Sequence, residues 1–171
     1  MLRLINDVLD ISKIESGMVF FAYTDVYLPS AMRDMYNIMQ LRMPENVELI
    51  LDPCPDIMIR TDNNRMVQIL SNLLTNAIKH TSCGSIRFGY TLEGDHVHFY
   101  VSDTGKGIPE KELDHIFGRF VQLKGAYNGI GLGLAISKGL VNKMGGEISV
   151  SSKVGEGSTF RFTLPLANIL S

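Results

Sequence analysis

The strongest constraint on the fold is the segment of residues 62–80, where apolar and polar residues separate onto two faces of a single helix. At about 100° per residue, one side of this helix carries the apolar residues Met66, Leu70, Leu73, Leu74 and Ala77. The polar residues occupy an arc of roughly 100° on the other side, and they are Asn72, Asn76, Lys79 and His80. Asp62 is suited to cap the first turn of the helix. We therefore expect one face in the core and a polar face directed elsewhere.

Strand-like and helical segments alternate on both sides of this helix. The expected strands are residues 18–23, 47–51, 57–60, 85–92, 96–102, 146–152 and 158–164. The other expected helices are residues 2–15, a segment from Pro29 to Pro44, a short helix from Pro109, and residues 132–144. Turns are expected at Gly94-Asp95 and across Gly155 and Gly157. This alternation predicts an α/β sandwich with a mixed sheet.

Composition limits the classes of function. The chain has 171 residues, 45% of them hydrophobic, which suits one compact domain with a core. Its net charge of −2, with acids and bases interspersed, argues against nucleic acid as a partner and against a polybasic membrane patch. Cys54 and Cys83 lack metal-ligand or redox spacing, and we expect reduced thiols. Since no apolar run approaches about 18 residues, any membrane anchor of the parent protein is expected outside this chain.

The segment DTGKGIP, residues 103–109, follows an apolar strand with one carboxylate and two glycines. Taken alone, it is consistent with an ordinary turn in which the aspartate hydrogen-bonds its own backbone. It is also consistent with a loop kept open for a ligand, and the segment by itself does not decide.

The two asparagines one turn apart, Asn72 and Asn76, are unusual for a helix interior, because asparagine amides compete for nearby backbone groups. One interpretation is a solvated face. The other is a ligand role: an amide oxygen is a hard, neutral ligand, and Mg²⁺ is often held by few protein groups together with phosphate oxygens and water. Lys79 would add positive charge for the same phosphates.

A glycine-rich segment, residues 128–137, opens the helix expected from Leu132. Unpaired backbone N–H groups at a helix start attract phosphate, and glycine allows close approach. Two familiar motifs are excluded: the sixth position counted from Gly129 is Leu134 rather than glycine, and Gly105-Lys106 is followed by Gly107 rather than serine or threonine. A nucleotide bound here therefore uses another fold.

Taken together, these segments resemble the ATP-binding domain of two-component sensor histidine kinases, within the superfamily that also contains gyrase-type ATPases. NLLTNAIKHT resembles the N box, DTGKGIP the first glycine box, IFGRF the F box and GIGLGLAIS the second glycine box. The resemblance covers about residues 46–165 and implies a Bergerat-type fold, in which a mixed, mainly antiparallel sheet carries helices on one face. VLDISKIESG resembles the end of the second dimerisation and phosphoacceptor helix, so we expect that helix over residues 1–17 and the catalytic domain over residues 18–171.

The resemblance also implies roles for individual residues at the base and the metal. Asp103 would accept a hydrogen bond from the adenine amino group, beside a loop formed by Gly105, Gly107 and Ile108. Asn76 would ligate Mg²⁺, with Asn72 supporting it. Lys79 would contact phosphate, and His80 stands where many relatives place an aromatic residue against the nucleotide.

Further roles are implied around the phosphates. Arg119 would reach the terminal phosphate, and Phe120, with Phe117, flanks the expected lid. The backbone of the second glycine box, at Gly129, Gly131, Leu132 and Gly133, would meet the phosphates. The lid is short, with one lysine, and Asn128 replaces a common glycine or serine.

The resemblance implies transfer of the ATP γ-phosphoryl group to a histidine, for relay to an aspartate of a response-regulator receiver domain. None of the four histidines, His80, His96, His98 and His115, is followed by the string that marks the family's acceptor, so the acceptor is expected upstream of Met1. The expected partners are ATP, the parent's own dimerisation hairpin and a receiver domain. The expected setting is a homodimeric parent with this domain in the cytoplasm, compatible with an inner-membrane anchor of the parent.

Two alternatives remain open. An ATP hydrolase clamp of the same superfamily would need a glutamate one turn before the metal-binding asparagine, but the chain has Asn72 there, and a neutral amide cannot act as general base. A non-catalytic, nucleotide-gated interaction module is disfavoured by the intact Asn76, Asp103 and glycine set, and nucleotide binding with and without Mg²⁺ would test it.

Overall fold

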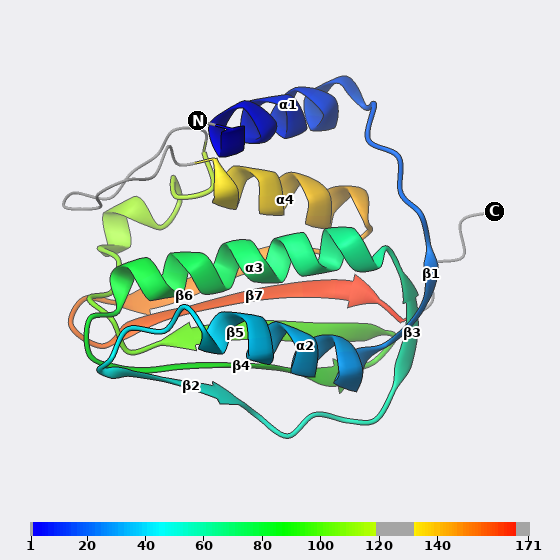
Figure 1. Ribbon diagram of the computed structural model, residues 1–171. Coiled ribbons are helices and arrows are strands. Elements are labelled where there is room, and N and C mark those ends of the chain that lie inside the picture. The colour runs from blue at the N-terminus through cyan, green and yellow to red at the C-terminus, as the bar shows by residue number, and fades with distance from the viewer. Residues whose placement is uncertain (1, 119–131, 167–171) are drawn as a thin grey trace.

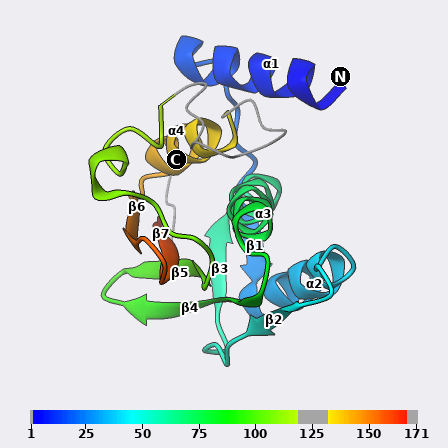
Figure 2. The same ribbon diagram turned by 90° about the vertical axis from the view of Figure 1, so that its left-hand side faces the viewer.

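The computed structural model describes residues 2–118 and 132–166 of the chain. In chain order its elements are α1 (Leu2–Ser16), β1 (Thr24–Tyr27), α2 (Leu28–Gln40), β2 (Val47–Leu51), β3 (Met58–Thr61), α3 (Asn63–His80), β4 (Gly84–Glu93), β5 (His96–Asp103), the short 3₁₀ helix η1 (Glu110–Glu112), α4 (Gly133–Lys143), β6 (Ile148–Lys153) and β7 (Gly157–Pro165). Helices and strands lie in separate layers, as the views in Figures 1 and 2 show.

The main sheet has five strands in the order β2-β4-β5-β7-β6. β4, β5, β7 and β6 pair antiparallel, and β2 joins the β4 edge in parallel. β1 and β3 form a separate antiparallel ribbon. The expected mixed, mainly antiparallel sheet with helices on one face is confirmed.

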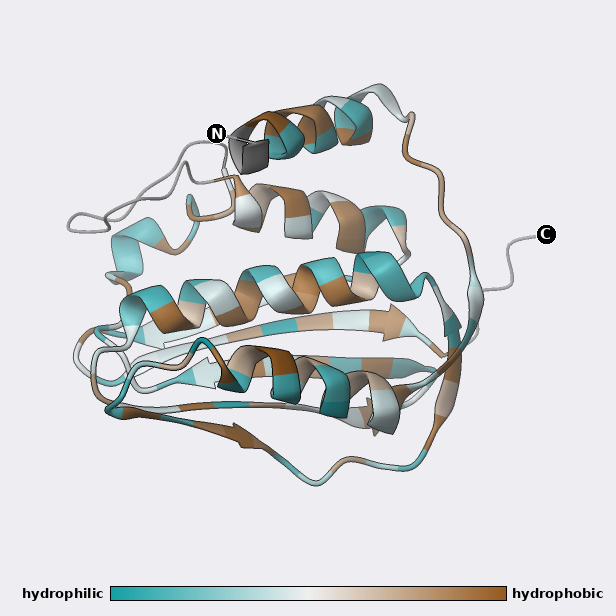
Figure 3. Ribbon diagram, viewed as in Figure 1, coloured by the Kyte–Doolittle hydropathy of each residue, from teal (hydrophilic) through white to brown (hydrophobic). Residues whose placement is uncertain are grey.

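Helix α3 lies over the middle of the sheet because its apolar face meets the inward-facing strand residues. Met66, Leu70 and Leu73 are fully buried there, and Asp62 caps the helix by accepting from the Arg65 backbone N–H at 3.1 Å. The sheet contributes stacked aromatic rings, with the centroids of Phe99 and Phe162 4.6 Å apart. Figure 3 shows apolar and polar residues alternating around α3, as the sequence predicts.

Strand β5 extends the buried side of the sheet as far as its last residue. Alternate residues of this strand, Val97, Phe99, Val101 and Asp103, are buried, and those between them are half-buried. Because strand side chains alternate between two faces, Asp103 points to the helix-covered face. The strand itself therefore aims this carboxylate toward the interior.

The segment between α1 and the sheet is not the strand expected at residues 18–23, and that prediction was wrong. This stretch connects α1 to β1 without ladder partners, and Phe20 is 89% exposed. Its backbone is held by the Asp62 carboxylate, which accepts from the Ala22 N–H at 2.8 Å, and by the Lys13 carbonyl, which accepts from the Met18 N–H at 2.9 Å. The ribbon strand begins later, at Thr24, where pairing with Thr61 becomes possible.

Helix α1 packs on α4 and α3. A Cβ atom added to Gly139 would lie 2.7 Å from Ile14 Cγ2, so a larger residue here would require Ile14 to shift. The Gln68 side-chain amide of α3 donates to the Asp10 carboxylate at 3.0 Å. In the described part of the chain, no helix is both long enough and apolar enough to cross a membrane.

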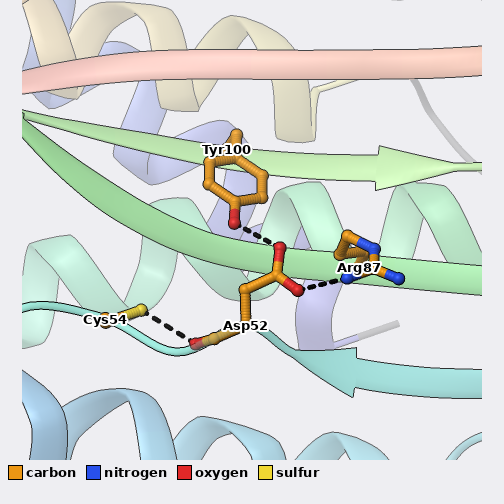
Figure 4. A network of polar contacts seen from close by, with 4 residues as sticks. All are labelled: Asp52, Cys54, Arg87 and Tyr100. Atoms are coloured by element: carbon orange, nitrogen blue, oxygen red, sulfur yellow. Dashed lines mark hydrogen bonds and ion pairs between the residues drawn. The ribbon is translucent and has the colours of Figure 1, made fainter.

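The outer face of the sheet is polar and holds the segment that follows β2. Figure 4 shows the Asp52 carboxylate between the Tyr100 hydroxyl and the Arg87 guanidinium, both of which donate to it. Tyr100 lies across Gly89, where an added Cβ would come within 2.9 Å of the Tyr100 hydroxyl oxygen. Cys54, a free cysteine, donates from Sγ to the Asp52 carbonyl at 3.1 Å. This network fastens the segment after β2 to the face opposite the helices.

Candidate functional site

The loop after β5 begins with a buried carboxylate that organises its own turn. Asp103 is only 6% exposed, and its Oδ1 accepts from the Gly105 N–H at 2.8 Å. Burial raises the pKa of Asp103, while hydrogen bonds from the backbone N–H groups of Gly105 and Ser158 act in the opposite direction. The first of the two interpretations of this segment, an aspartate that hydrogen-bonds its own loop, is therefore correct. The Asp103 carboxylate can also accept further hydrogen bonds, because a carboxylate has about four lone-pair sites.

Helix α3 ends against this loop. Its last carbonyl, at His80, accepts from the Lys106 N–H at 3.3 Å, which satisfies one of the carbonyl groups that a helix end leaves open. A Cβ atom added to Gly105 would lie 2.2 Å from the His80 oxygen. Gly105 is therefore required for the close approach of loop and helix.

The other end of the polar face of α3 meets the start of α4. The Asn72 side-chain amide donates to the Gly133 carbonyl and to Ser137 Oγ, both at 3.2 Å. Ser137 is fully buried and donates its own hydroxyl to the Gly133 carbonyl at 2.9 Å. The first turn of α4 is thereby tied to α3.

Asn76 lies between these two contacts. It is one helical turn from both Asn72 and His80, about 6 Å along the axis from each. Its side chain is half-buried, and within the described ranges no hydrogen bond to its amide is found. Lys79 is exposed on the same stretch of helix. One face of α3 thus joins both glycine segments, with Asn76 at its middle.

The environment of His80 disfavours the charged form of its ring. Desolvation by burial lowers the pKa of its ring, and the positive charges of Lys106 and Lys79 lower it further. Its Nδ1 is buried and has no hydrogen-bond partner among the described residues. A half-buried imidazole whose charged form is disfavoured is suited to packing against an uncharged ring.

The β6–β7 hairpin closes the loop from the other side, a contact that the sequence did not predict. Gly107 has φ +76°, and a Cβ there would lie 2.2 Å from the Lys153 oxygen. The Gly155 N–H donates to the Lys106 carbonyl at 2.9 Å, and Gly157 packs with its Cα against the Asp103 carbonyl. Gly155 and Gly157 were interpreted as turn residues alone. The second glycine was the sequence feature that could have indicated this contact, since one glycine is enough for the turn.

Several sequence-predicted residues lie outside the described residues: Arg119, Phe120, Asn128, Gly129 and Gly131. Of the others, Ile108 and Leu132 are buried, and Leu132 directly precedes α4. Phe117 contacts the core ring of Phe160 edge-on at a centroid distance of 6.1 Å, which supports its interpretation as a core anchor.

The donor set fits a metal that arrives with a nucleotide. Where the structure describes the chain, no group of three or more histidine, cysteine, aspartate or glutamate residues could hold a metal ion by itself. The half-buried amide of Asn76 offers one hard oxygen, which suits Mg²⁺ bound mainly by phosphate oxygens and water.

The comparisons with known proteins agree with this geometry. The sequence profile described as "Histidine kinase-, DNA gyrase B-, and HSP90-like ATPase" matches residues 61–168. The Aerobic respiration control sensor protein ArcB of Escherichia coli (strain K12) is 40% identical over 174 residues, covering 95% of this chain and 22% of that protein. The chain therefore spans about a fifth of the length of this curated relative.

Two solved structures carry the same fold. Full-length ShkA in complex with AMPPNP superposes with a TM-score of 0.86 at 33% identity, over 99% of this chain and 36% of that chain. The nucleotide-free catalytic domain of the histidine kinase ThkA gives a TM-score of 0.76 at 26% identity, over 86% of this chain and 97% of that chain. The chain belongs to the histidine kinase-, DNA gyrase B- and HSP90-like ATPase family, as the ATP-binding catalytic domain of a sensor histidine kinase.

Proposed function

We propose that this domain binds ATP with Mg²⁺ along the polar face of α3 and positions its γ-phosphoryl group for transfer to a histidine of the parent protein. The observation that carries the proposal is the pair of contacts at either end of that face. Asn72 reaches the start of α4, and His80 reaches the loop after Asp103. Asn76 stands between them, so one nucleotide can span all three places.

The orientation of the nucleotide follows from the chemistry of each end. Asp103 is a buried acceptor at the end of β5, suited to an exocyclic amino group of adenine. The start of α4 offers backbone N–H groups and the positive end of a helix dipole, which suit phosphate. Asn76 would give one oxygen to Mg²⁺, whose role when bound is to neutralise phosphate charge. The family resemblance implies the remaining roles. Phosphate contacts are proposed for Lys79, Arg119 and the backbone of Gly129 and Gly131, and Phe120 would flank the lid.

The acceptor histidine is proposed to belong to the dimerisation hairpin of the parent protein. His96 and His98 lie on the outer face of β5, on the side away from Asp103. His115 is exposed after η1, and His80 is held with a lowered pKa beside two lysines. None of these histidines is followed by the sequence motif that marks the phosphoacceptor histidine of the family. We further propose that the parent assembles as a homodimer through its dimerisation hairpin, to whose second helix α1 would belong. The phosphoryl group would then pass to a receiver-domain aspartate.

The hydrolase alternative is less well supported. The position that would need a carboxylate to activate water is Asn72, and its amide is already engaged with Gly133 and Ser137. Phosphoryl transfer needs positioning and charge neutralisation from the protein more than a strong base.

The first test is adenine recognition. Asp103→Asn keeps the shape of the side chain but replaces one acceptor oxygen with a donor group. Losing a hydrogen bond to a charged acceptor costs about 1.5–3 kcal/mol, so we expect ADP to bind more than about tenfold more weakly by titration calorimetry. Unchanged affinity would exclude Asp103 as the adenine acceptor. Circular dichroism should show an unaltered fold.

The second test is group transfer. The chain is mixed with the parent's dimerisation hairpin and ATP labelled at the γ-phosphoryl group, and acid-labile label is measured on the hairpin. Asn76→Ala should abolish transfer, because it removes the metal ligand. Transfer that is equal with and without the hairpin histidine would contradict the kinase proposal. Absence of nucleotide binding at millimolar concentration would favour the interaction module instead.

A further inference from the structure

We infer that Ser152, on the hairpin opposite α3, is a positioning residue for the nucleotide: its hydroxyl group fixes the Ile108 end of the loop that follows Asp103. The inference rests on the proposed function, because it assigns a task to a residue that supports the proposed adenine loop. Ser152 is the next-to-last residue of β6 and is half-buried.

The hydroxyl of Ser152 makes three hydrogen bonds. Its Oγ accepts from the Ile108 N–H at 2.8 Å, lies 2.8 Å from the Gly157 carbonyl, and lies 2.7 Å from Ser158 Oγ. A serine hydroxyl has one proton and two lone pairs. The Gly157 carbonyl can only accept, so the Ser152 proton goes there and Ser158 donates its own proton to Ser152. In this arrangement every donor and acceptor site of the Ser152 hydroxyl is used.

These bonds secure the part of the loop that Asp103 does not hold. Asp103 fixes the first half through Gly105, and Lys106 is held between the His80 carbonyl and the Gly155 N–H. Beyond Lys106, the bond to the Ile108 N–H comes from Ser152. The Ile108 side chain is buried, so movement of its backbone moves the wall beside the proposed base site.

The Ser152 hydroxyl adds two side-chain hydrogen bonds to β7, but the backbone ladder of the hairpin does not depend on it. β6 and β7 pair continuously from Ile148 with Phe162 to Lys153 with Gly157, through backbone groups. Removing the Ser152 hydroxyl therefore leaves the ladder intact and releases the loop. This distinguishes a positioning role from a purely structural one.

The test uses an isosteric pair. Ser152→Thr keeps the hydroxyl, and Ser152→Val has the same shape without it, while both residues favour strands. Ser152→Ala is the smaller deletion. Ser151→Ala is the matched control, because Ser151 is exposed on the same strand and its hydroxyl only accepts from Arg161 at 3.1 Å, away from the loop. ADP affinity is measured by calorimetry with and without Mg²⁺, and amide hydrogen exchange is followed at Ile108.

We expect Ser152→Val and Ser152→Ala to weaken ADP binding by about three- to tenfold, because only one of the three lost hydrogen bonds, the one from the Ile108 N–H, holds the loop. The factor should be the same with and without Mg²⁺, because the loop faces the base and the metal belongs to the phosphates. The Ile108 amide should exchange faster in both variants, while the Val150 and Phe160 amides keep their wild-type rates. Ser152→Thr and Ser151→Ala should bind within about twofold of wild type.

Equal affinities of the Thr and Val variants would overturn the inference, and so would an unchanged exchange rate at Ile108 in Ser152→Val. If the wild-type chain binds no ADP, the proposed function fails, and this inference fails with it. If the wild-type chain binds ADP and all variants bind it equally, only the role of Ser152 is lost.

Discussion

Gly105→Ala should weaken both nucleotide binding and the stability of the fold, because the glycine stands where α3 and the loop after Asp103 touch. The added Cβ would lie 2.2 Å from the His80 carbonyl oxygen and 2.9 Å from Asp103 Oδ1, whereas real Cβ atoms keep at least 3.0 Å. The first obstacle is backbone at a helix end and cannot turn aside as a side chain would. The loop and the helix must therefore separate by at least about 0.8 Å.

That separation has two calculable consequences. The bond from Lys106 N–H to the His80 carbonyl is already 3.3 Å long and would break, and overpacking of this kind costs about 1–3 kcal/mol of stability. A similar displacement of Asp103 would lengthen the proposed hydrogen bond to adenine beyond hydrogen-bonding distance. Losing that bond is worth about 1.5–3 kcal/mol, so ADP should bind at least about tenfold more weakly.

Calorimetric titration with ADP gives the affinity, and urea unfolding gives the stability, both at a temperature where the variant stays folded. Gly94→Ala is the matched control: Gly94 also lies in a turn, at φ +62°, and an added Cβ would meet nothing within 4 Å. It should lose about 1–2 kcal/mol through backbone strain but keep wild-type affinity. Gly105→Ala binding ADP within about twofold of wild type would refute the steric reasoning.

Three further predictions concern the elements around the site. Asp62→Ala should lower the free energy of unfolding, measured in urea, by about 1–3 kcal/mol, since it removes the α3 cap and leaves the Ala22 N–H unpaired. Asp62→Asn should lose less stability, and equal losses in the two variants would contradict the capping role. Because burial lowers the pKa of folded His80, the unfolded chain takes up a proton first as the pH falls below 6.5, and the free energy of unfolding should decrease from there down to the folded pKa. His80→Gln should flatten that part of the profile of urea midpoint against pH, and an identical profile would exclude His80 as the source of the pH dependence. Gly139→Leu should push Ile14 away and release α1, giving faster amide exchange in α1 although leucine favours α4 as a helix; unchanged exchange in α1 would show that the contact is not needed.

The sequence predicted those features that depend on local pattern. The apolar face of residues 63–80 needed only its own periodicity to be placed on the sheet, and Asp62 needed only its position before the first turn to be recognised as a cap. The strand ending at Asp103 was readable from alternation and from the glycine that follows. These predictions were confirmed.

Contacts between distant segments were not readable in this way. Nothing local in Ser152 distinguishes it from a surface serine, because its partner Ile108 is 44 residues away. Asn72 was expected to support a metal ligand, and only the fold reveals that its amide holds the start of α4, 61 residues further along the chain. The apolar run at residues 18–23 has the composition of a strand, but no strand in residues 2–118 and 132–166 pairs with it.

Because inward-facing and outward-facing residues alternate along β5, the proposed recognition of adenine depends on the length of the strand as well as on Asp103 at its end. Deleting one residue between the Gly94 turn and Asp103 would invert that end of the strand, so that the carboxylate faced the outer, polar side of the sheet. Backbone pairing with β4 and β7 could re-form one residue along, yet the domain would have lost the proposed acceptor for the base. Insertions and deletions in β5 should therefore be as damaging to nucleotide binding as replacement of the aspartate itself.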